Sequence, residues 1–576
     1  MRIVLAYPPP WKISAPGEQP DERDGPPPDF VPGDLDADFY QTPYGLFTLA
    51  AQAMAAGHQV KVVNLSSFAW ADVEQFIAGL PVDVFGMSCW TANRRGVALV
   101  ADCVRQHHPG AHIVVGGPHA TPLSHQILAH HAAIDSVALG EAETTFLELL
   151  QRLEARQSLS GLAGAVVRNG SGIEQGPPRA TIAPLDSLAC PHQHFATHIV
   201  MTSRGCPWNC TFCGAETTWG RGFRGHSVPY VLDMIEQALD RLPVRMLQIK
   251  DDTFTANRKR VSEICRGIRD RDLRFLWSCD TRVDVLSEDL LREMRLAGCE
   301  RLSLGVESGS PSILRLINKK ITVDQILKST EMAKRVGIQV RYYMMLGNRG
   351  ETSETFRESL DFLSRARPHQ AIFSCLSIYP GTQDYHDAVA AGRVRAEDYF
   401  GGKFQELKMP FDASAEDARV MNDWFAANSG LMRLCRPSVD DCRAALDRLG
   451  DHPPAHLDLA GALLDEDKLD AAVQHAEQAL RLGHPTPGIV HNLLACVFHR
   501  QGDLEKMKDQ LVQAGRTDPQ HPVLLRNAQA ARTWLGRGPR ASATALMLDP
   551  SHDFQLLERT MQPTLPGPLG DNTRSW

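Results

Sequence analysis

Short apolar runs alternate with longer amphipathic stretches over the first 155 residues. The apolar runs have the length of buried strands, and the longer stretches carry apolar residues at helical spacing. The first run, at 2–7, is followed to about residue 38 by a segment rich in Pro, Asp and Gly, which indicates a long loop. Strands that alternate with helices favour a parallel sheet covered on both faces. The pattern therefore predicts an α/β fold that begins with a doubly wound, Rossmann-like sheet ending near residue 155, with strands near 2–7, 58–65, 82–90, 111–120 and 135–140.

A second alternation of strands and helices follows a connector at 156–198. The connector holds Gly-rich hairpin material at 161–173 and a loop-like stretch at 185–194. Beyond it, six apolar runs are separated by helical stretches, which predicts a partial or complete (β/α) barrel of parallel strands. We assign this barrel to 199–400, with strands near 197–205, 245–252, 274–280, 301–308, 339–346 and 370–380.

The chain repeats itself near its C-terminal end, at a spacing of 34 to 35 positions. Leu469 and its surroundings align with Leu504 and its surroundings, and a third unit starts at 521. This is the period of tetratricopeptide-like helix pairs. Because two or three units are a minimal array, they either bind a protein, carrier or peptide or simply pack on the barrel. The predicted all-α segments are a helical linker at 401–452 and the repeats at 453–538, with an irregular tail at 539–576.

Composition limits the partners that the chain can have. Apolar residues make up 43% of the 576 positions and charged residues 22%, as in ordinary globular domains. The formal net charge of −8 gives no basic field for nucleic acid or an anionic membrane. Only five apolar residues precede Pro8 without interruption, and no stretch of eighteen uncharged apolar residues occurs. We therefore expect a cytoplasmic protein that binds neither nucleic acid nor membrane.

Three of the 13 cysteines stand together in the segment CPWNCTFC, at Cys206, Cys210 and Cys213. Thiolates are the soft ligands that iron–sulfur clusters require. Three ligands leave one iron of a 4Fe-4S cube open to an outside donor. A structural zinc site is the alternative, but such sites use four Cys or His ligands in paired groups, and only His226 is available as a stray fourth ligand.

The other cysteines are scattered along the chain. Cys435 and Cys442 are separated by six residues and could hold a second metal or a soft substrate. We interpret them instead as ordinary thiols of the helical linker.

The cysteine motif resembles that of the radical S-adenosylmethionine (SAM) superfamily. In that family the open iron chelates the amino and carboxylate groups of SAM, which implies reductive cleavage to a 5'-deoxyadenosyl radical. The resemblance extends to segments that follow successive predicted strands, at 250–255, 277–284, 304–319, 343–352 and 379–385. Since ligands lie at the carboxyl ends of parallel strands, these segments are expected to converge on one site. The resemblance implies SAM contacts from Asp252, Ser278, Glu307 and Arg341, with Glu307 as the first candidate and Asp280 and Arg282 at the same edge.

The N-terminal sheet resembles the cobalamin-binding domain that is fused to one large radical SAM subgroup. The segments that carry the resemblance are 43–60, 86–96, 115–121 and 139–146. Small residues in them let the backbone approach a large flat ring, although loop glycines of any doubly wound fold would look the same. The D-x-H-x-x-G motif that supplies a lower axial His in some cobalamin proteins does not occur. The resemblance implies cobalamin contacts from Ser88, Thr91, Gly116, Gly117, His119, Gly140 and Glu141.

These resemblances imply an enzyme whose cofactors are a 4Fe-4S cluster, SAM and cobalamin, with an external electron donor of the flavodoxin or ferredoxin type. The favoured activity is a cobalamin-dependent methyltransferase that acts on an unactivated carbon or phosphorus of a small molecule or peptide, through the deoxyadenosyl radical and methylcobalamin. Two alternatives remain open. One is a radical cyclase or rearrangement enzyme that uses cobalamin without methyl transfer, and the other is a cobalamin-binding sensor or scaffold. The sequence does not identify a catalytic residue or the substrate.

Overall fold

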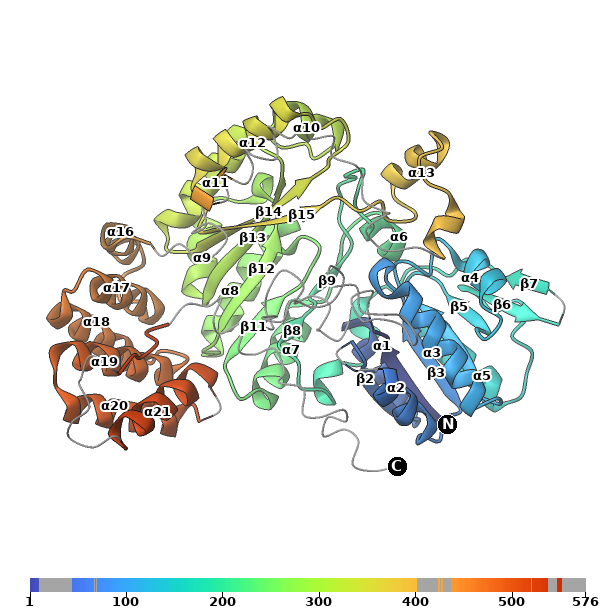
Figure 1. Ribbon diagram of the computed structural model, residues 1–576, viewed down its shortest axis with the longest axis horizontal. Coiled ribbons are helices and arrows are strands. Elements are labelled where there is room, and N and C mark those ends of the chain that lie inside the picture. The colour runs from blue at the N-terminus through green and yellow to red at the C-terminus, as the bar shows by residue number, and fades with distance from the viewer. Residues whose placement is uncertain are drawn as a thin grey trace.

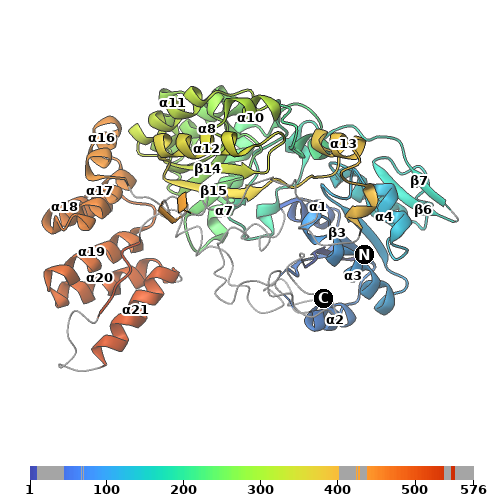
Figure 2. The same cartoon turned by 45° about the horizontal axis from the view of Figure 1, so that its top comes forward.

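Three units follow one another in the computed structural model (Figure 1). An N-terminal α/β unit packs beside a central α/β unit, and a helical array lies on the opposite side of the central unit; Figure 2 shows the same order from a second direction. Among the described residues, no helix has the length and apolar character needed to cross a membrane. The structure describes residues 1–9, 44–66, 68, 70–170, 172–400, 423–424, 426–427, 437–519, 521–536 and 546–551. The predicted loop from 10 to about 38, most of the predicted linker including Cys435, and most of the predicted tail lie outside these residues.

The N-terminal unit is built on a seven-stranded sheet in the order β2–β1–β3–β4–β5–β6–β7. Strands β1 to β5 are parallel, and helices cover both faces, as the alternating pattern predicts. The strands read as apolar runs because they are buried on both sides. Their bounds are β1 (Arg2–Tyr7), β2 (Gln59–Asn64), β3 (Val84–Ser88), β4 (His112–Gly116) and β5 (Ser136–Ala138). The helices are α1 (Tyr44–Ala55), α2 (Trp70–Ala78), α3 (Arg94–His107), α4 (Ser124–His130) and α5 (Glu143–Glu154).

Two later segments join this unit. The hairpin β6 (Ala165–Asn169) and β7 (Gly172–Gln175) adds two antiparallel strands to the sheet, so the prediction that the sheet ends near residue 155 is wrong. Residues that follow the central sheet also return to the N-terminal core: Tyr385 of α13 (Gln383–Ala390) and Tyr399 pack among its apolar side chains. The sequence predicts a connector here because the short apolar run of the hairpin does not indicate that it pairs with β5.

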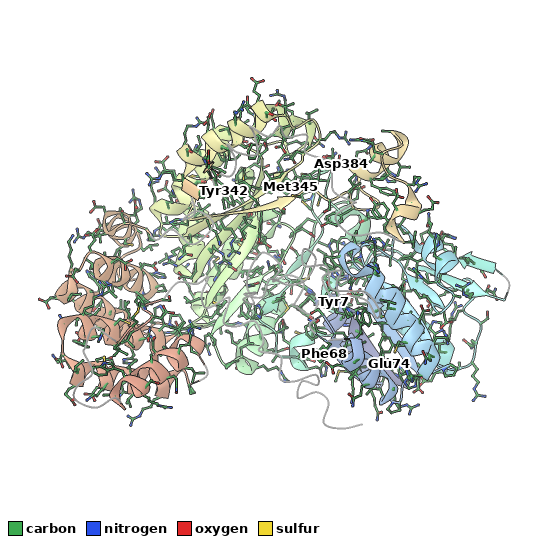
Figure 3. All side chains as sticks on the ribbon, in the orientation of Figure 1. Tyr7, Phe68, Glu74, Tyr342, Met345 and Asp384 are labelled. Atoms are coloured by element: carbon green, nitrogen blue, oxygen red, sulfur yellow. The ribbon has the colours of Figure 1, made fainter. Side chains whose placement is uncertain are left out.

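The central unit contains the six parallel strands that the sequence predicts, in the order β15–β14–β13–β12–β11–β8. One face of the sheet packs on helices: Tyr342 is fully buried and stacks on Phe362 with ring centroids 5.9 Å apart. Side chains alternate along a strand, so Met345 lies on the other face of the same strand as Tyr342 (Figure 3). The strands are β8 (Ile199–Val200), β11 (Met246–Ile249), β12 (Leu276–Thr281), β13 (Cys299–Glu307), β14 (Gln339–Leu346) and β15 (Gln370–Cys375). The helices are α7 (Val228–Arg241), α8 (Arg258–Asp270), α9 (Glu288–Leu296), α10 (Pro311–Leu316), α11 (Val323–Arg335) and α12 (Ser353–Ala366).

The C-terminal array consists of consecutive antiparallel helices with a shared apolar core. It is joined to the central unit by Arg295, a fully buried residue at the end of α9, whose Nη2 donates to Asp458 Oδ2 of the array at 2.7 Å. The helical character of this region is confirmed, and its assignment to tetratricopeptide repeats stays a prediction. The helices are α16 (Val439–Leu449), α17 (Pro453–Asp465), α18 (Leu469–Arg481), α19 (Pro487–Gln501), α20 (Leu504–Thr517) and α21 (Pro522–Leu535).

Candidate functional site

The three clustered cysteines lie in a loop between β9 (Ser203–Arg204) and α6 (Ala215–Trp219). This loop follows β8 at the carboxyl edge of the central sheet, where ligands of parallel sheets are bound. Cys206 and Cys210 are half-buried and Cys213 is exposed, and all three are free thiols. The backbone N–H of Cys213 donates to the carbonyl oxygen of Cys210 at 3.2 Å, which tightens the turn that carries both thiols.

Two carboxyl groups of the segment 250–255 hold the start of this loop in place. Asp251 is 2% exposed and accepts hydrogen bonds from the backbone and hydroxyl groups of both Thr202 and Ser203, at 2.6 to 3.1 Å. Asp252 Oδ2 accepts the backbone N–H of Gly205 at 2.9 Å, immediately before the first cysteine. Desolvation by the surrounding protein, followed by the neighbouring charge of Asp251, raises the pKa of Asp252 to about 6. The end of β11 therefore positions the cysteine loop through two adjacent carboxyl groups.

Two cations flank the middle cysteine. Arg282 Nη1 approaches the Sγ of Cys210 at 3.8 Å, and its guanidinium lies 4.5 Å from the ring centroid of Trp208. Lys319 is 5% exposed and lies 5.8 Å from the ring centroid of Phe212, inside the same loop. Burial raises the pKa of the Cys210 thiol, and the positive charges of Lys319 and Arg282 oppose that shift. Burial thus disfavours a bare thiolate at Cys210, and the two cations are the groups that would stabilise negative charge on its sulfur.

The four residues implied for SAM contact lie at different positions relative to the ends of their strands, so not all of them are at the carboxyl edge of the sheet. Asp252 lies three positions after the end of β11, and Glu307 ends β13 at a register shift, where its backbone adopts a positive φ of 69° that is rare for a residue other than Gly. Glu307 Oε1 accepts from Lys319 Nζ at 2.7 Å. Ser278 is buried within β12. Arg341 is the third residue of the eight in β14 and donates to Gln370 at 2.6 Å, so its predicted place at a strand end is wrong.

The residues implied for cobalamin contact lie on the loops that follow β3, β4 and β5. Ser88 ends β3, and its hydroxyl accepts from the indole N–H of Trp90, a 45% exposed side chain at this edge. Gly116 ends β4, and Gly117 has a φ of 107° where an added Cβ would lie 2.8 Å from the carbonyl oxygen of Cys89. Gly140, also at positive φ, follows β5. Half-exposed Ser88 and these glycines form a cradle of small residues at the carboxyl edge.

Thr91 and His119 form an interior pair below this cradle. The Thr91 hydroxyl lies 3.1 Å from His119 Nδ1, and both side chains are at most 5% exposed. Tyr399, from the segment that returns after the central sheet, covers the imidazole with ring centroids 6.1 Å apart. Burial lowers the pKa of His119 to about 3, so the ring is neutral. The resemblance implies a cobalamin contact from His119, whereas in the structure its side chain is packed in the interior against Tyr399.

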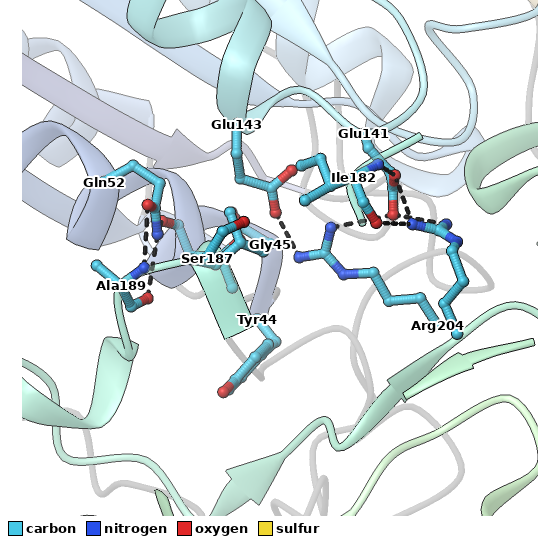
Figure 4. A network of polar contacts seen from close by, with 12 residues as sticks. Tyr44, Gly45, Gln52, Glu141, Glu143, Ile182, Ser187, Ala189 and Arg204 are labelled. Carbon is cyan, nitrogen blue, oxygen red and sulfur yellow. Dashed lines mark hydrogen bonds and ion pairs between the residues drawn. The ribbon is translucent and has the colours of Figure 1, made fainter. Parts of the chain in front are cut away.

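Glu141 joins the two α/β units (Figure 4). Its Oε1 pairs with Arg204 Nη1 at 3.1 Å and with Arg224 Nη2 at 2.8 Å, and its Oε2 accepts the backbone N–H of Ile182 at 2.8 Å. The second guanidinium nitrogen of Arg204 pairs with Glu143. The side chains of Glu141, Glu143 and Arg204 are all at most 7% exposed. The carboxylate implied for cobalamin contact is therefore occupied by an ion-pair network that reaches the cysteine loop.

The donor set of the loop fits an iron–sulfur cluster better than a single metal ion. In the part of the chain that the structure describes, no three His, Cys, Asp or Glu side chains converge on one metal position. A single zinc ion needs convergent ligands, whereas each cysteine of a 4Fe-4S cluster binds a different iron. His226 pairs instead with Asp186, at 3.0 Å, which removes the stray fourth ligand of the zinc alternative.

Several residues of the site were not identified from the sequence. Arg204 looks like a turn residue, and Glu143 like a residue on the exposed side of a helix, because their partners come from segments more than 60 positions away. Lys319 stands at the end of a segment that was identified, but no local pattern indicates that it pairs with Glu307. The only sequence signal for these residues is that Arg204 stands directly before Gly205 and Cys206, next to the cysteine loop.

Comparison with protein families assigns both α/β units. The radical SAM superfamily model matches residues 200–363, and the B12-binding domain model matches residues 35–150. The chain thus combines a radical SAM domain with a cobalamin-binding domain, and its cofactors are a 4Fe-4S cluster, SAM and cobalamin.

The chain is similar to several known proteins. An uncharacterized methyltransferase of Pyrococcus horikoshii is 29% identical over 60% of this chain and 78% of its own length. The anaerobic magnesium-protoporphyrin IX monomethyl ester cyclase of Rubrivivax gelatinosus is 27% identical over 54% of this chain and 59% of its own length. The solved structure of the radical SAM methyltransferase TsrM from Kitasatospora setae superposes with a TM-score of 0.54 at 17% identity, over 68% of this chain and 77% of that one. This last likeness concerns the fold.

Proposed function

We propose that this protein is a cobalamin-dependent radical SAM methyltransferase that acts on an unactivated carbon or phosphorus of a small-molecule or peptide substrate. The observation that carries the proposal is the buried network in which Arg204, next to the cysteine loop, pairs with Glu141 and Glu143 of the cobalamin-binding domain. It joins the carboxyl edges of the two sheets, so that the cofactors of both domains can serve one substrate. The similarity to the Pyrococcus methyltransferase supports this activity.

In this proposal the residues of the central unit hold and orient the cofactors. Cys206, Cys210 and Cys213 ligate the cluster, and Asp252 and Glu307 contact SAM from the ends of β11 and β13. When bound, the reduced cluster with SAM supplies a 5'-deoxyadenosyl radical, and cobalamin supplies a carrier for a methyl group. Ser278 contributes from deeper in the sheet.

The cobalamin-binding domain supplies the surface on which the ring lies. We propose contacts from Ser88, Gly116, Gly117 and Gly140, whose small size lets the backbone approach a flat ring. Thr91 and His119 support this surface from the interior. We expect the enzyme to work in the cytoplasm with an external electron donor of the flavodoxin or ferredoxin type.

Cyclisation or rearrangement without methyl transfer is the second candidate. The similarity to the anaerobic cyclase of Rubrivivax favours it. In that case cobalamin would serve as an electron carrier, and SAM would be consumed only to make the radical.

The test is the fate of SAM in anaerobic protein reconstituted with iron, sulfide and hydroxocobalamin and reduced with dithionite. Methyltransferase activity predicts both 5'-deoxyadenosine and S-adenosylhomocysteine, with the methyl label of SAM appearing on the cobalamin. Cyclisation predicts 5'-deoxyadenosine alone. The triple variant C206A/C210A/C213A is expected to lose the cluster absorbance and 5'-deoxyadenosine. If the fully loaded protein forms neither product, or if the triple variant retains both the cluster and the radical chemistry, the proposal is wrong.

A further inference from the structure

The helical array shows a structural repeat in its polar contacts. His456 Nδ1 of α17 meets His475 Nδ1 of α18 at 2.9 Å, and His491 Nδ1 of α19 meets Gln510 Oε1 of α20 at 2.7 Å. Both members of the second pair stand 35 positions after their counterparts in the first. Helices α17, α19 and α21 therefore occupy equivalent places, and side chains at one repeat position form a row.

One such row carries two asparagines, Asn492 of α19 and Asn527 of α21, which are also 35 positions apart. Their side chains are 0% and 2% exposed. The Nδ2 of Asn527 donates to Oδ1 of Asn492 at 2.7 Å, so the two amides are held in one orientation. Buried amides of this kind need partners for their remaining donors and acceptors.

Those partners are main-chain groups of Asp549, in a short segment of the same chain, 546–551, that has no regular secondary structure. Asn492 Nδ2 donates to the Asp549 carbonyl oxygen at 2.9 Å, and Asn527 Nδ2 donates to the same oxygen at 2.8 Å. In return, the backbone N–H of Asp549 donates to Asn527 Oδ1 at 2.8 Å. The backbone N–H and C=O of Asp549 are thus both hydrogen-bonded by the two asparagines. These bonds do not depend on which side chain that residue carries.

Side chains of the segment add an apolar anchor and one charge pair. Leu546 is 4% exposed and belongs to the apolar core of the array, and Leu548 packs against that core. The Asp549 carboxylate pairs with Arg526 Nη2 of α21 at 3.1 Å. The array therefore offers this segment an apolar contact, a clamp of two amide side chains that bind the backbone of Asp549, and the cation of Arg526.

We propose that this face of the array is a docking groove for an extended peptide segment of a partner protein, and that residues 546–551 occupy it in the free enzyme. The partner segment carries a leucine three residues before the clamped residue and an acidic side chain at that residue, like Leu546 and Asp549. It binds by displacing the enzyme's own segment. This inference goes beyond the methyl-transfer proposal and needs no cofactor for its test.

The experiment measures binding of a fluorescein-labelled peptide with the sequence of residues 543–554 to the full-length protein, by fluorescence anisotropy. In the variant L546D/L548D the tail is released from the groove without shortening the chain. We expect this variant to bind the peptide at least tenfold more tightly than wild type, because its groove is open. The same peptide with an N-methyl group on the nitrogen of its aspartate lacks the donor to Asn527, and we expect it to bind the released variant at least tenfold more weakly.

Two further variants test the clamp in the released background. N527D keeps the size and one acceptor of the side chain but loses its donors, and we expect it to lose peptide binding. Q529A changes an exposed side chain of the same helix and is expected to bind normally. Equal binding by wild type and the released variant would overturn the proposal, as would equal binding of the N-methylated peptide. A concentration-dependent dimer of wild type that disappears on tail release would assign the groove to a second copy and would equally overturn it.

Discussion

At the scale of single residues, the guanidinium of Arg282 connects three parts of the candidate cluster site. It approaches Cys210, lies on Trp208 and donates to the backbone carbonyl of Lys319 at 2.6 Å. A positive charge beside the cluster stabilises its reduced form. We therefore expect R282Q to lower the reduction potential of the reconstituted cluster by about 40 mV, which corresponds to about 1 kcal/mol for one electron.

A redox titration followed by electron paramagnetic resonance measures this shift directly. R258Q removes a cation from an exposed arginine that caps the backbone at Val285 and is the matched control. A potential that is unchanged in R282Q, or changed equally in R258Q, would mean that Arg282 does not act on the cluster electrostatically.

At the level of residues, the sequence gives a clear signal where the candidate ligands are close together in the chain. The cysteine loop could be recognised because its three thiols lie within eight positions. The resemblance implies a cobalamin contact from Glu141, but the arginine partners that occupy its carboxylate stand 63 and 83 positions away, where no local pattern points to them. Arg341 was expected at the carboxyl edge because of the family resemblance, although the strand predicted at 339–346 has the same bounds as β14 and places Arg341 near its start.

At the scale of elements, the loop after β5 and the strand β9 are joined by Arg204. Its guanidinium pairs with both Glu141 and Glu143, and its Cζ lies 5.0 Å from the ring centroid of Trp219. We expect E143Q to leave part of a buried charge uncompensated and to cost about 3 kcal/mol of unfolding free energy. Because the pair also holds the two cofactor edges together, we expect the variant to form more 5'-deoxyadenosine for each S-adenosylhomocysteine.

The control for this prediction is R221Q, which breaks an exposed ion pair to Glu216 on the nearby helix α6. Exposed pairs contribute at most about 1 kcal/mol, so stability and product ratio should both stay near wild type. If E143Q loses stability but keeps the wild-type product ratio, the network is structural only.

Element prediction failed where a segment pairs with a distant part of the chain. The parallel strands could be predicted because each is a continuous apolar run between helices. The hairpin β6–β7 has the same local pattern as a free hairpin, and only its pairing with β5 makes it part of the first sheet. The return of residues 376–400 to the N-terminal core is likewise a tertiary event, since their apolar residues specify burial but not the unit that buries them.

At the scale of the whole molecule, the central unit and the array are held together by Arg295. This residue pairs with Glu300 of its own unit and with Asp458 of α17. In D458N the buried guanidinium of Arg295 still pairs with Glu300. We therefore expect the free energy of unfolding to fall by about 2 kcal/mol, which is less than the full cost of an unpaired buried charge. Calorimetry should show the array unfolding at a lower temperature than the α/β units, and a single unshifted transition would contradict this role.

The junction between the same two units also contains a titratable group, His369. It is fully engaged in the fold: its Nδ1 accepts the backbone N–H of Val340 at 2.9 Å, and burial followed by the positive charge of Lys334 lowers its pKa to about 4, against a weaker opposing effect of Asp441. The folded state therefore prefers the neutral ring, while the unfolded chain takes up a proton near pH 6.5. This stabilising contribution is present above pH 6.5 and is lost as the pH falls from 6.5 toward 4.

The variant H369Q isolates this contribution, because glutamine can still accept from Val340 but does not titrate. Urea unfolding at pH 7.5 and pH 5.5 should show that wild type loses about 1 kcal/mol more than H369Q between the two pH values. Only the difference between wild type and H369Q reports on His369. The pKa of Asp252 is raised to about 6, so protonation of this group stabilises the folded state of both proteins as the pH falls over the same interval. An equal loss in wild type and H369Q would show that the ring is protonated in the folded state and that the junction opens to solvent near pH 6.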